Sequence, residues 1–480
     1  MPRELRADYS QSYLLPPSVE DWVGPAHPAR FIRAFVESLD FGELGIQWNQ
    51  GIDGAPTYSA DLLLKVWLYG YFMNLRSTRK LEAGCREQMG LVWLAGMHTP
   101  DHNTLWRFFN RNKPALRGLF KHSVRVAVRS DMVGMVVHAL DGTKVRSKVA
   151  TRGRLGREAL EKLLTQLDQT LSDWEEEIEQ TAAPEEAGTG IPEHLQGEAR
   201  LREKVRAALA ELDAEELEQV HPEDPEARVM KCSDIHAKRL AYNSQAVVDA
   251  DCGIIVAQDV SNEATDHHQL TPMLNRVEEE LSECADTTLA DAGYATADGF
   301  AEAEVAGRTV LVNLPSRMKG DPNNPYHASH FDYDPESDTV TCPLGETLVY
   351  KHTRKHRSKG QELRLYRCMN KDCPVRAQCT KDRKGRGIEL GPNHAALARQ
   401  KRRQREEDAQ ALLKRRRGLI ERVFGTIKDG YGFRRFTRHG LENAQTEWAL
   451  MCTTYNMKKL YNRWKDHRMN PSPNRNPIPA

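Results

Sequence analysis

Apolar residues recur at spacings of three and four through residues 61–75, DLLLKVWLYGYFMNL, and Pro56 and Ser59 stand just ahead of them. This spacing places apolar side chains on one face of a helix, and serine is a preferred first residue. We therefore expect a helical domain over residues 1–133. A further helix is expected within it, starting near Asp101 or Asn103.

That further helix carries the cations Arg107 and Arg111. A turn followed by a cationic helix suits insertion into a DNA groove, where such side chains contact phosphates or bases. Helix-turn-helix units also occur as plain packing modules, and this alternative stays open.

The pattern changes at residues 135–140, MVVHAL, which end at Asp141 and Gly142. A β-branched run of this length predicts a buried strand that delivers an acid to its C-terminal edge. Leucines at heptad spacing follow over residues 160–178, and a second helical stretch covers residues 201–212. These two helices predict an acidic antiparallel hairpin, inserted over residues 151–227 for packing or self-association.

Strand signals resume in residues 239–250 and 252–260, which we expect to form an antiparallel hairpin. A helix is expected over residues 268–281. A short strand then ends at Asp291, and another follows at residues 308–315. The fold class predicted from this order is α/β, with a mixed sheet of five strands.

Two acids at strand ends can meet in space, and a third is sought on a helix. Residues 415–430, RRRGLIERVFGTIKDG, supply Glu421, with Arg417 and Lys428 expected on the same face. Asp141, Asp291 and Glu421 together would hold Mg²⁺, or Mn²⁺, as a pair of ions that drive phosphoryl displacement. Taken singly, Asp141 could cap a turn before Gly142, Asp291 could cap the helix after Gly293, and Glu421 could pair with Lys428.

The formal net charge is zero, but the charges are unevenly distributed. Residues 157–227 hold 6 Lys and Arg against 21 Asp and Glu, whereas residues 381–438 hold 18 against 7. The basic segment favours neutralisation of DNA phosphates, with a salt-bridged exposed helix as the alternative. No apolar run approaches the roughly 20 residues of a membrane span, and the start of the chain lacks signal-peptide features, so we expect an intracellular protein.

Three motifs resemble those of the DDE transposases of bacterial insertion sequences: ALDGTKV around Asp141, TLADAGYATADGF around Asp291, and a long segment around Glu421. Arg417, Glu421 and Lys428 match the family's Tyr-Arg-Glu-Lys signature, whereas its tyrosine position is occupied by Lys414. The stretch APTYSADLLLKVWLYGYFMNLRSTRKLEAGC is similar to the helical domain that precedes the catalytic core in this group.

The resemblance implies an RNase H-like catalytic domain over residues 134–150 and 228–464, and a terminal tail over residues 465–480. It implies excision and integration of an insertion sequence by metal-dependent hydrolysis and strand transfer. The expected partners are double-stranded DNA (terminal repeats and target) and further copies of this chain on paired ends, in the bacterial cytoplasm at the nucleoid. The residues expected to contact DNA are Arg107, Arg111, Lys144, Lys414, Arg415, Arg416, Arg417, Lys428, Arg434 and Arg435. A nuclease without strand transfer and a non-catalytic DNA-binding derivative are the alternatives.

Four of the nine cysteines, Cys342, Cys368, Cys373 and Cys379, lie in a small insertion over residues 335–385. Four thiolates suit a closed tetrahedral zinc site, although the spacing is looser than in paired C-x-x-C units. The alternative is a set of separate reduced thiols. A zinc ion here would order the insertion and would not take part in the chemistry.

Overall fold

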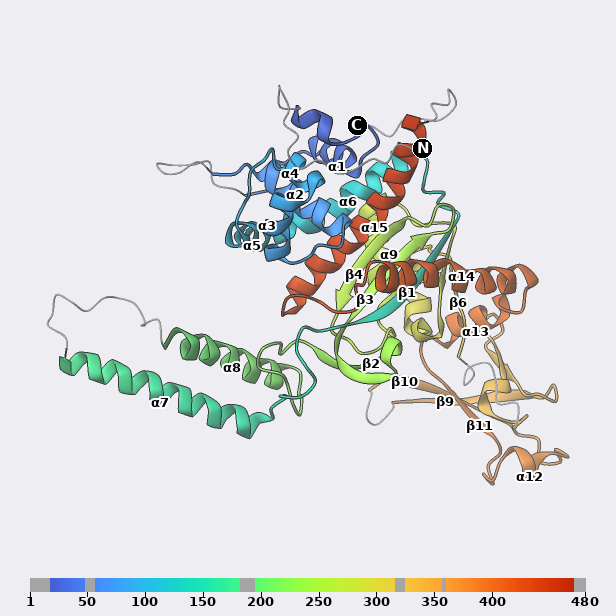
Figure 1. Cartoon of the computed structure of the whole chain (residues 1–480). Coiled ribbons are helices and arrows are strands. Elements are labelled where there is room, and N and C mark those ends of the chain that lie inside the picture. Colours follow the sequence, from blue (N-terminus) through green and yellow to red (C-terminus); the bar gives the residue numbers. More distant parts are fainter. Residues whose placement is uncertain (1–17, 48–56, 182–194, 316–323, 356–359, 470–480) are drawn as a thin grey trace, which may run out of the picture. The chain divides into compact units, whose positions relative to one another are not determined.

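The computed structural model describes residues 18–47, 57–181, 195–315, 324–355 and 360–469 (Figure 1). The chain forms two compact units, one from residues 1–131 and 449–480 and one from residues 132–448. None of the described helices is long and apolar enough to cross a membrane.

The first unit is helical, as the sequence predicts. Ser59 begins α2 by accepting from the Leu62 amide at 3.2 Å, and Asp101 begins α5 by accepting from the Asn103 amide at 2.9 Å. Its described helices are η1 Val19–Trp22, α1 Pro28–Glu37, α2 Ala60–Phe72, α3 Thr78–Glu87, α4 Met89–Leu94, α5 His102–Arg111, α6 Lys113–Arg129 and the part of α15 Leu441–Met469 from residue 449 on. The sequence-based domain boundary at residue 464 thus differs from the division of the structure, which falls within α15.

A six-stranded mixed sheet forms the centre of the second unit, rather than the five strands expected. Its order is β2-β3-β1-β5-β6, and β4 also pairs with β3. The strands are β1 Val137–Arg146, β2 Arg228–Cys232, β3 Ala237–Asp249, β4 Ile255–Ser261, β5 Thr287–Ala290 and β6 Val310–Val312. The additional strand, β2, carries cations at an edge of the sheet, where polar side chains can face water. Its sequence RVMKC therefore lacks a continuous apolar run.

Helices complete this unit: α7 Arg157–Thr181, α8 Gln196–Ala214, α9 Leu270–Leu281, α10 Ala297–Val305, α13 His394–Arg403, α14 Glu407–Gly425 and the start of α15. Helix α14 lies against β1, β5 and β6, where Ala409 joins Val137, Leu289 and Leu311 in one apolar cluster.

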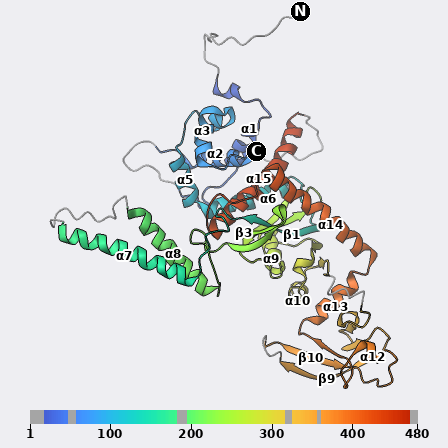
Figure 2. The ribbon, with the colours of Figure 1, turned by 60° about the horizontal axis from the view of Figure 1, so that its bottom comes forward.

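The predicted acidic hairpin is present, and Figures 1 and 2 both show α7 and α8 side by side. Leu160 and Leu167 of α7 pack against Val205 and Leu212 of α8. At the base of the hairpin, the two chain segments exchange backbone hydrogen bonds between Leu155 and Val220, of 2.8 and 3.1 Å. The heptad leucines thus form the contact between the helices.

A separate five-stranded antiparallel sheet contains the cysteine-bearing insertion. Its order is β11-β10-β9-β8-β7, with a core around the fully buried Tyr366. Its elements are β7 Asp332–Asp334, β8 Thr339–Thr341, β9 Thr347–Lys355, β10 Glu362–Arg367, α12 Arg376–Cys379 and β11 Gly387–Leu390.

Candidate active site

The strand register brings the two predicted aspartates to one place. Strands β1 and β5 are parallel and pair from Val137 with Thr287 to Ala139 with Leu289. Asp141 and Asp291 each stand two residues beyond this last pair. Parallel strands present the same end at one edge of the sheet, so the two carboxylates share that edge.

The sequence predicts that Asp141 ends its strand, and this prediction is wrong. Strand β1 continues to Arg146 because it stays paired with β3, in which Ala246 is the partner of Asp141. Only the pairing with β5 stops before Asp141. Asp291 does follow the end of β5, and it accepts a hydrogen bond from the Gly293 amide at 2.7 Å.

Burial dominates the electrostatics of Asp141, whose side chain is 19% exposed. Burial raises the pKa of this carboxyl to about 6; the Arg416 guanidinium opposes the rise, and the charge of Asp291 adds to it. The contact between Arg416 and the Asp141 carboxylate measures 3.1 Å. A buried acid beside a second acid disfavours its own ionised form unless a cation compensates.

Asp266, in the loop between β4 and α9, is a third carboxylate of this region. Its Oδ1 accepts hydrogen bonds from the Lys144 ammonium at 3.0 Å and from the side-chain amides of Asn243 and Gln245 at 2.7 and 2.8 Å. Three donors on one oxygen hold the carboxylate in a defined position.

Two further observations place Asp266 beside the pair. A Cβ built on Gly293 would lie 2.9 Å from Asp291 Oδ1 and 3.4 Å from Asp266 Oδ2. The fully buried Tyr294 has a raised pKa because of burial first, and then because of the charges of Asp266, Asp141 and Asp291. The three carboxylates therefore lie close together around Gly293 and Tyr294. Sequence reasoning missed Asp266, although the polar segment TDHH between a strand and a helix was a usable signal.

Glu421 is not brought to this neighbourhood in the described structure. Its side chain is 59% exposed and pairs with Arg417 at 2.8 Å on the surface of α14. The residue that α14 presents to Asp141 is Arg416, and five residues correspond to about 140° around a helix. The expectation that α14 would present Glu421 together with the two aspartates is thus not met by this arrangement.

Lys428 was expected on one helix face with Arg417 and Glu421, and this expectation is wrong. Helix α14 ends at Gly425, and residues Thr426–Gly430 form a π-helical turn (η6), which changes the phase of the following side chains. Lys428 is only 8% exposed, and its ammonium donates to the Lys144 carbonyl at 3.1 Å. Burial lowers the pKa of Lys428, and the charge of Asp234 opposes this lowering.

The remaining predicted DNA contacts of the second unit fall into two groups. Arg434 pairs with Asp429, and Arg435 donates to the Ser147 carbonyl at 3.0 Å, so both fasten the chain after η6. Lys414 and Arg415 are exposed on α14.

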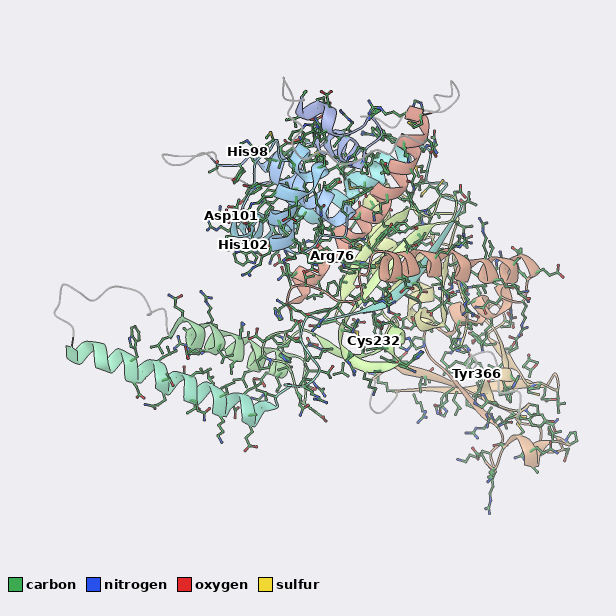
Figure 3. All side chains as sticks on the ribbon, in the orientation of Figure 1. Arg76, His98, Asp101, His102, Cys232 and Tyr366 are labelled. Carbon is green, nitrogen blue, oxygen red and sulfur yellow. The ribbon has the colours of Figure 1, made fainter. Side chains whose placement is uncertain are left out.

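In the helical unit, Arg107 and Arg111 are exposed on α5, beside Trp106, which is 55% exposed. Figure 3 shows Asp101 and His102 at the start of this helix. The His102 ring nitrogen Nδ1 lies 2.9 Å from Glu82 of α3, which ties the two helices together.

The four predicted zinc ligands gather at one end of the small sheet. Strands β8 and β10 both run antiparallel to β9, so Cys342 and Cys368, which follow them, lie where β9 begins. The loop that carries Cys373 and Cys379 leaves and returns at this end, where the Cys368 amide donates to the Arg386 carbonyl at 2.9 Å. Burial raises the pKa of the Cys379 thiol, and the charges of the other three thiols add to the rise.

In the part of the chain that the structure describes, no group of three or more His, Cys, Asp or Glu side chains is arranged to hold a metal ion. Neither the acids nor the thiols therefore form a complete ligand shell as they stand.

Two segments of the chain match known families. Residues 341–461 match the family described as a transposase DDE domain, and residues 17–111 match the family described as a transposase domain (DUF772). The first match includes Glu421 but neither aspartate; the second includes Arg107 and Arg111. A search of the curated proteins finds no match. In these two segments the chain is therefore similar to transposases.

Proposed function

We propose that this protein is a DNA transposase that excises and integrates an insertion sequence by metal-dependent phosphodiester hydrolysis and strand transfer. It acts as an oligomer on paired element ends, in the cytoplasm at the nucleoid. The catalytic unit, residues 132–448, is proposed to have an RNase H-like core. The similarity of residues 17–111 and 341–461 to transposase domains supports this function.

The observation that carries the proposal is the register of β1 and β5, which sets Asp141 and Asp291 at equivalent positions beyond their last shared pair. Carboxylates arranged in this way on parallel strands suit work on a phosphodiester, because oxygen ligands are those that Mg²⁺ and Mn²⁺ prefer. When bound, such ions activate a water or 3′-hydroxyl and stabilise the leaving oxygen.

The chain's own residues set the conditions for this chemistry. With a pKa of about 6, Asp141 is mostly ionised at neutral pH, so it can offer a charged oxygen to a cation. Arg416 compensates that charge in the described structure and would have to share it with a bound cation. The fit is incomplete, since only the two aspartates and Asp266 share the neighbourhood. We propose Glu421 as the third catalytic carboxylate, because Arg417, Glu421 and Lys428 match the family signature along the sequence.

The same observations favour one second candidate, a non-catalytic DNA-binding derivative. In that protein Arg416 would permanently neutralise Asp141, and Glu421 would remain paired with Arg417 at the surface. A nuclease on the same fold, which cleaves DNA without joining it, is the third candidate function that an experiment must distinguish.

One assay distinguishes these functions: incubation with Mg²⁺ and labelled DNA that carries the ends flanking this gene, for the wild type and Asp141→Asn. Joined products from the wild type alone would establish the transposase. Cleavage without joining would identify a nuclease, and binding with neither would identify the non-catalytic derivative.

We further propose that α5 binds the element ends through Arg107 and Arg111, because both are exposed on a helix that the paired Glu82 and His102 fix in place. We also propose a structural Zn²⁺ on Cys342, Cys368, Cys373 and Cys379. The support is their common position at one end of the small sheet; the ion would have to draw the thiols together, as metal binding commonly does in small domains.

A further inference from the structure

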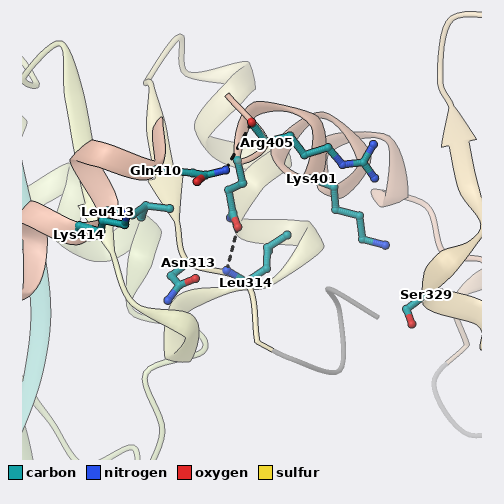
Figure 4. A pocket seen from close by; sticks show the side chains of 9 residues that line it. Asn313, Leu314, Ser329, Lys401, Arg405, Gln410, Leu413 and Lys414 are labelled. Atoms are coloured by element: carbon teal, nitrogen blue, oxygen red, sulfur yellow. Dashed lines mark hydrogen bonds between the residues drawn. The ribbon is translucent and has the colours of Figure 1, made fainter. Parts of the chain in front are cut away.

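A cavity of about 560 Å³ opens beside the candidate active site. Its lining includes Asn313 after β6, Lys401 of α13, Arg405 in the following turn, and Gln410 and Lys414 of α14, as Figure 4 shows. Apart from Leu314 and Leu413, the described side chains that line it are polar or cationic, and none of these is acidic.

The cavity adjoins Asp291 through the sheet. Strands β5 and β6 pair in parallel up to Ala290 with Val312, and the Asn313 amide donates to the Ala290 carbonyl at 3.2 Å. Neighbouring strands lie about 4.8 Å apart, so the cavity begins about one strand spacing from Asp291. The side chain of Gln404 accepts from the Leu314 amide at 3.4 Å and so joins the end of α13 to this edge.

The cations of the cavity differ from most of their neighbours in their ion pairing. Lys401, Arg405 and Lys414 form no ion pair with any described residue. By contrast, most cations around them in the chain are paired: Arg399 with Glu304, Arg402 with Asp334, Arg403 with Asp408, Arg416 with Asp141 and Arg417 with Glu421. Arg415, exposed on α14, is an exception among them. The described acids of this region thus form ion pairs with most of the surrounding cations, but not with the three that line the cavity.

The charges are also close enough to affect one another. Burial lowers the pKa of Lys401; the charge of Asp332 opposes this, and the charge of Arg405 adds to it. Cations without an ion pair in a concave, partly buried site attract an anion more strongly than the same charges on an open surface.

We infer that this cavity binds backbone phosphates of the DNA strand beside the bond that is cut. The inference rests on the proposed function and extends it with a position for the strand. Lys401, Arg405 and Lys414 supply the charge, and the side-chain amides of Asn313 and Gln410 can donate to phosphate oxygens. Contacts of this kind fix the register of the strand without reading its sequence.

The experiment measures binding of end-bearing DNA to the full-length protein by fluorescence anisotropy over a range of salt concentrations. The test variant is Lys401→Gln with Arg405→Gln. The matched control is Lys162→Gln with Arg200→Gln, which also removes one lysine and one arginine from exposed or partly exposed sites without a described ion pair, but in the acidic hairpin. Each lost phosphate contact lowers the slope of log K against log salt by about 0.9, so the test variant should lose about 1.8 and the control close to nothing.

The single variant Lys414→Gln should lower the slope by about 0.9. Because this position is exposed, the single variant keeps the test valid even if the double variant misfolds. Uncharged methylphosphonates placed singly along the DNA then locate the contact. Substitution next to the cleavage site should weaken the wild type but not the test variant. Equal slopes for the test variant and control would overturn the inference while DNA binding stands. Absence of salt-dependent binding by the wild type would instead overturn the proposed function.

Discussion

Replacing Asp141 by asparagine should stabilise the metal-free protein while abolishing catalysis. Asp141 is buried, and its pKa is raised from 3.8 to about 6, so its ionised form is less favourable in the folded protein than in the unfolded chain. Asparagine keeps the shape of the side chain and removes the charge. The gain in stability follows from removing an unfavourable charge that function requires.

The magnitude follows from the shift, because each pKa unit corresponds to 1.36 kcal/mol. The rise of the pKa from 3.8 to about 6 sets an upper limit of about 3 kcal/mol on the gain in the free energy of unfolding. We expect a gain of about 1–3 kcal/mol at pH 7, because in the variant Arg416 retains only an amide oxygen as its partner. The folded protein binds the proton more tightly than the unfolded chain between pH 3.8 and 6. The free energy of unfolding of the wild type therefore falls as the pH rises through this window, and the advantage of Asp141→Asn should vanish near pH 4.

Calorimetric melting in EDTA tests this on the transition of residues 132–448, at pH 7 and at pH 4. A gain of 1 kcal/mol corresponds to roughly 2 °C in Tm for a domain of this size. Asp408→Asn is the control of opposite sign, because the Arg403 guanidinium lowers the pKa of that exposed carboxyl to about 2. It should melt no higher than the wild type at pH 7. The reasoning is refuted if Asp141→Asn melts at or below the wild-type temperature at pH 7, or if its advantage is the same at both pH values.

Three further outcomes are expected. Glu421→Gln should abolish cleavage, because the neutral amide does not replace the carboxylate proposed to hold the metal, but leave DNA affinity within about twofold, because the side chain is exposed and its described ion pair is with Arg417; retained cleavage would remove Glu421 from the site. Asp266→Asn should lower cleavage by about tenfold or more, because Lys144, Asn243 and Gln245 would donate to a neutral amide oxygen and the ion pair with Lys144 would be lost; unchanged rates, with Asp298→Asn as a surface control, would exclude a positioning role. Cys373→Ser should reduce zinc to below one ion per chain and lower the melting temperature, with Cys252→Ser as control; purified wild type without zinc in elemental analysis would contradict the zinc site.

Local patterns predicted the parts of the fold that local forces determine. Ser59 and Asp101 start their helices by side-chain hydrogen bonds to nearby amides, and the leucines of residues 160–212 pack between two helices joined in sequence. The two aspartates were also predictable as neighbours, because each follows an apolar run that parallel pairing places at the same edge.

The remaining features depend on contacts between distant segments. The second half of β1 is polar and holds as a strand only because β3 lies beside it. Lys428 leaves the expected face because of one π-helical turn, which no residue spacing reveals. Asp266 is held at the site by a hydrogen bond from Lys144, which is 122 residues away in the chain. Only the folded structure therefore identifies Asp266 as part of the site.

The paired backbone bonds of Leu155 and Val220 join the two segments that enter and leave the helical hairpin. The described helices between these residues, α7 and α8, therefore form an appendage that contacts the edge strand β2 through the ion pair of Glu211 with Arg228. Exchange of this appendage for a short linker should preserve the sheet, and a foreign domain with closely spaced ends could be grafted at the same point. The hydrogen-bonded pair of Leu155 and Val220 is thus a suitable junction for inserting a tag, a reporter or a targeting module.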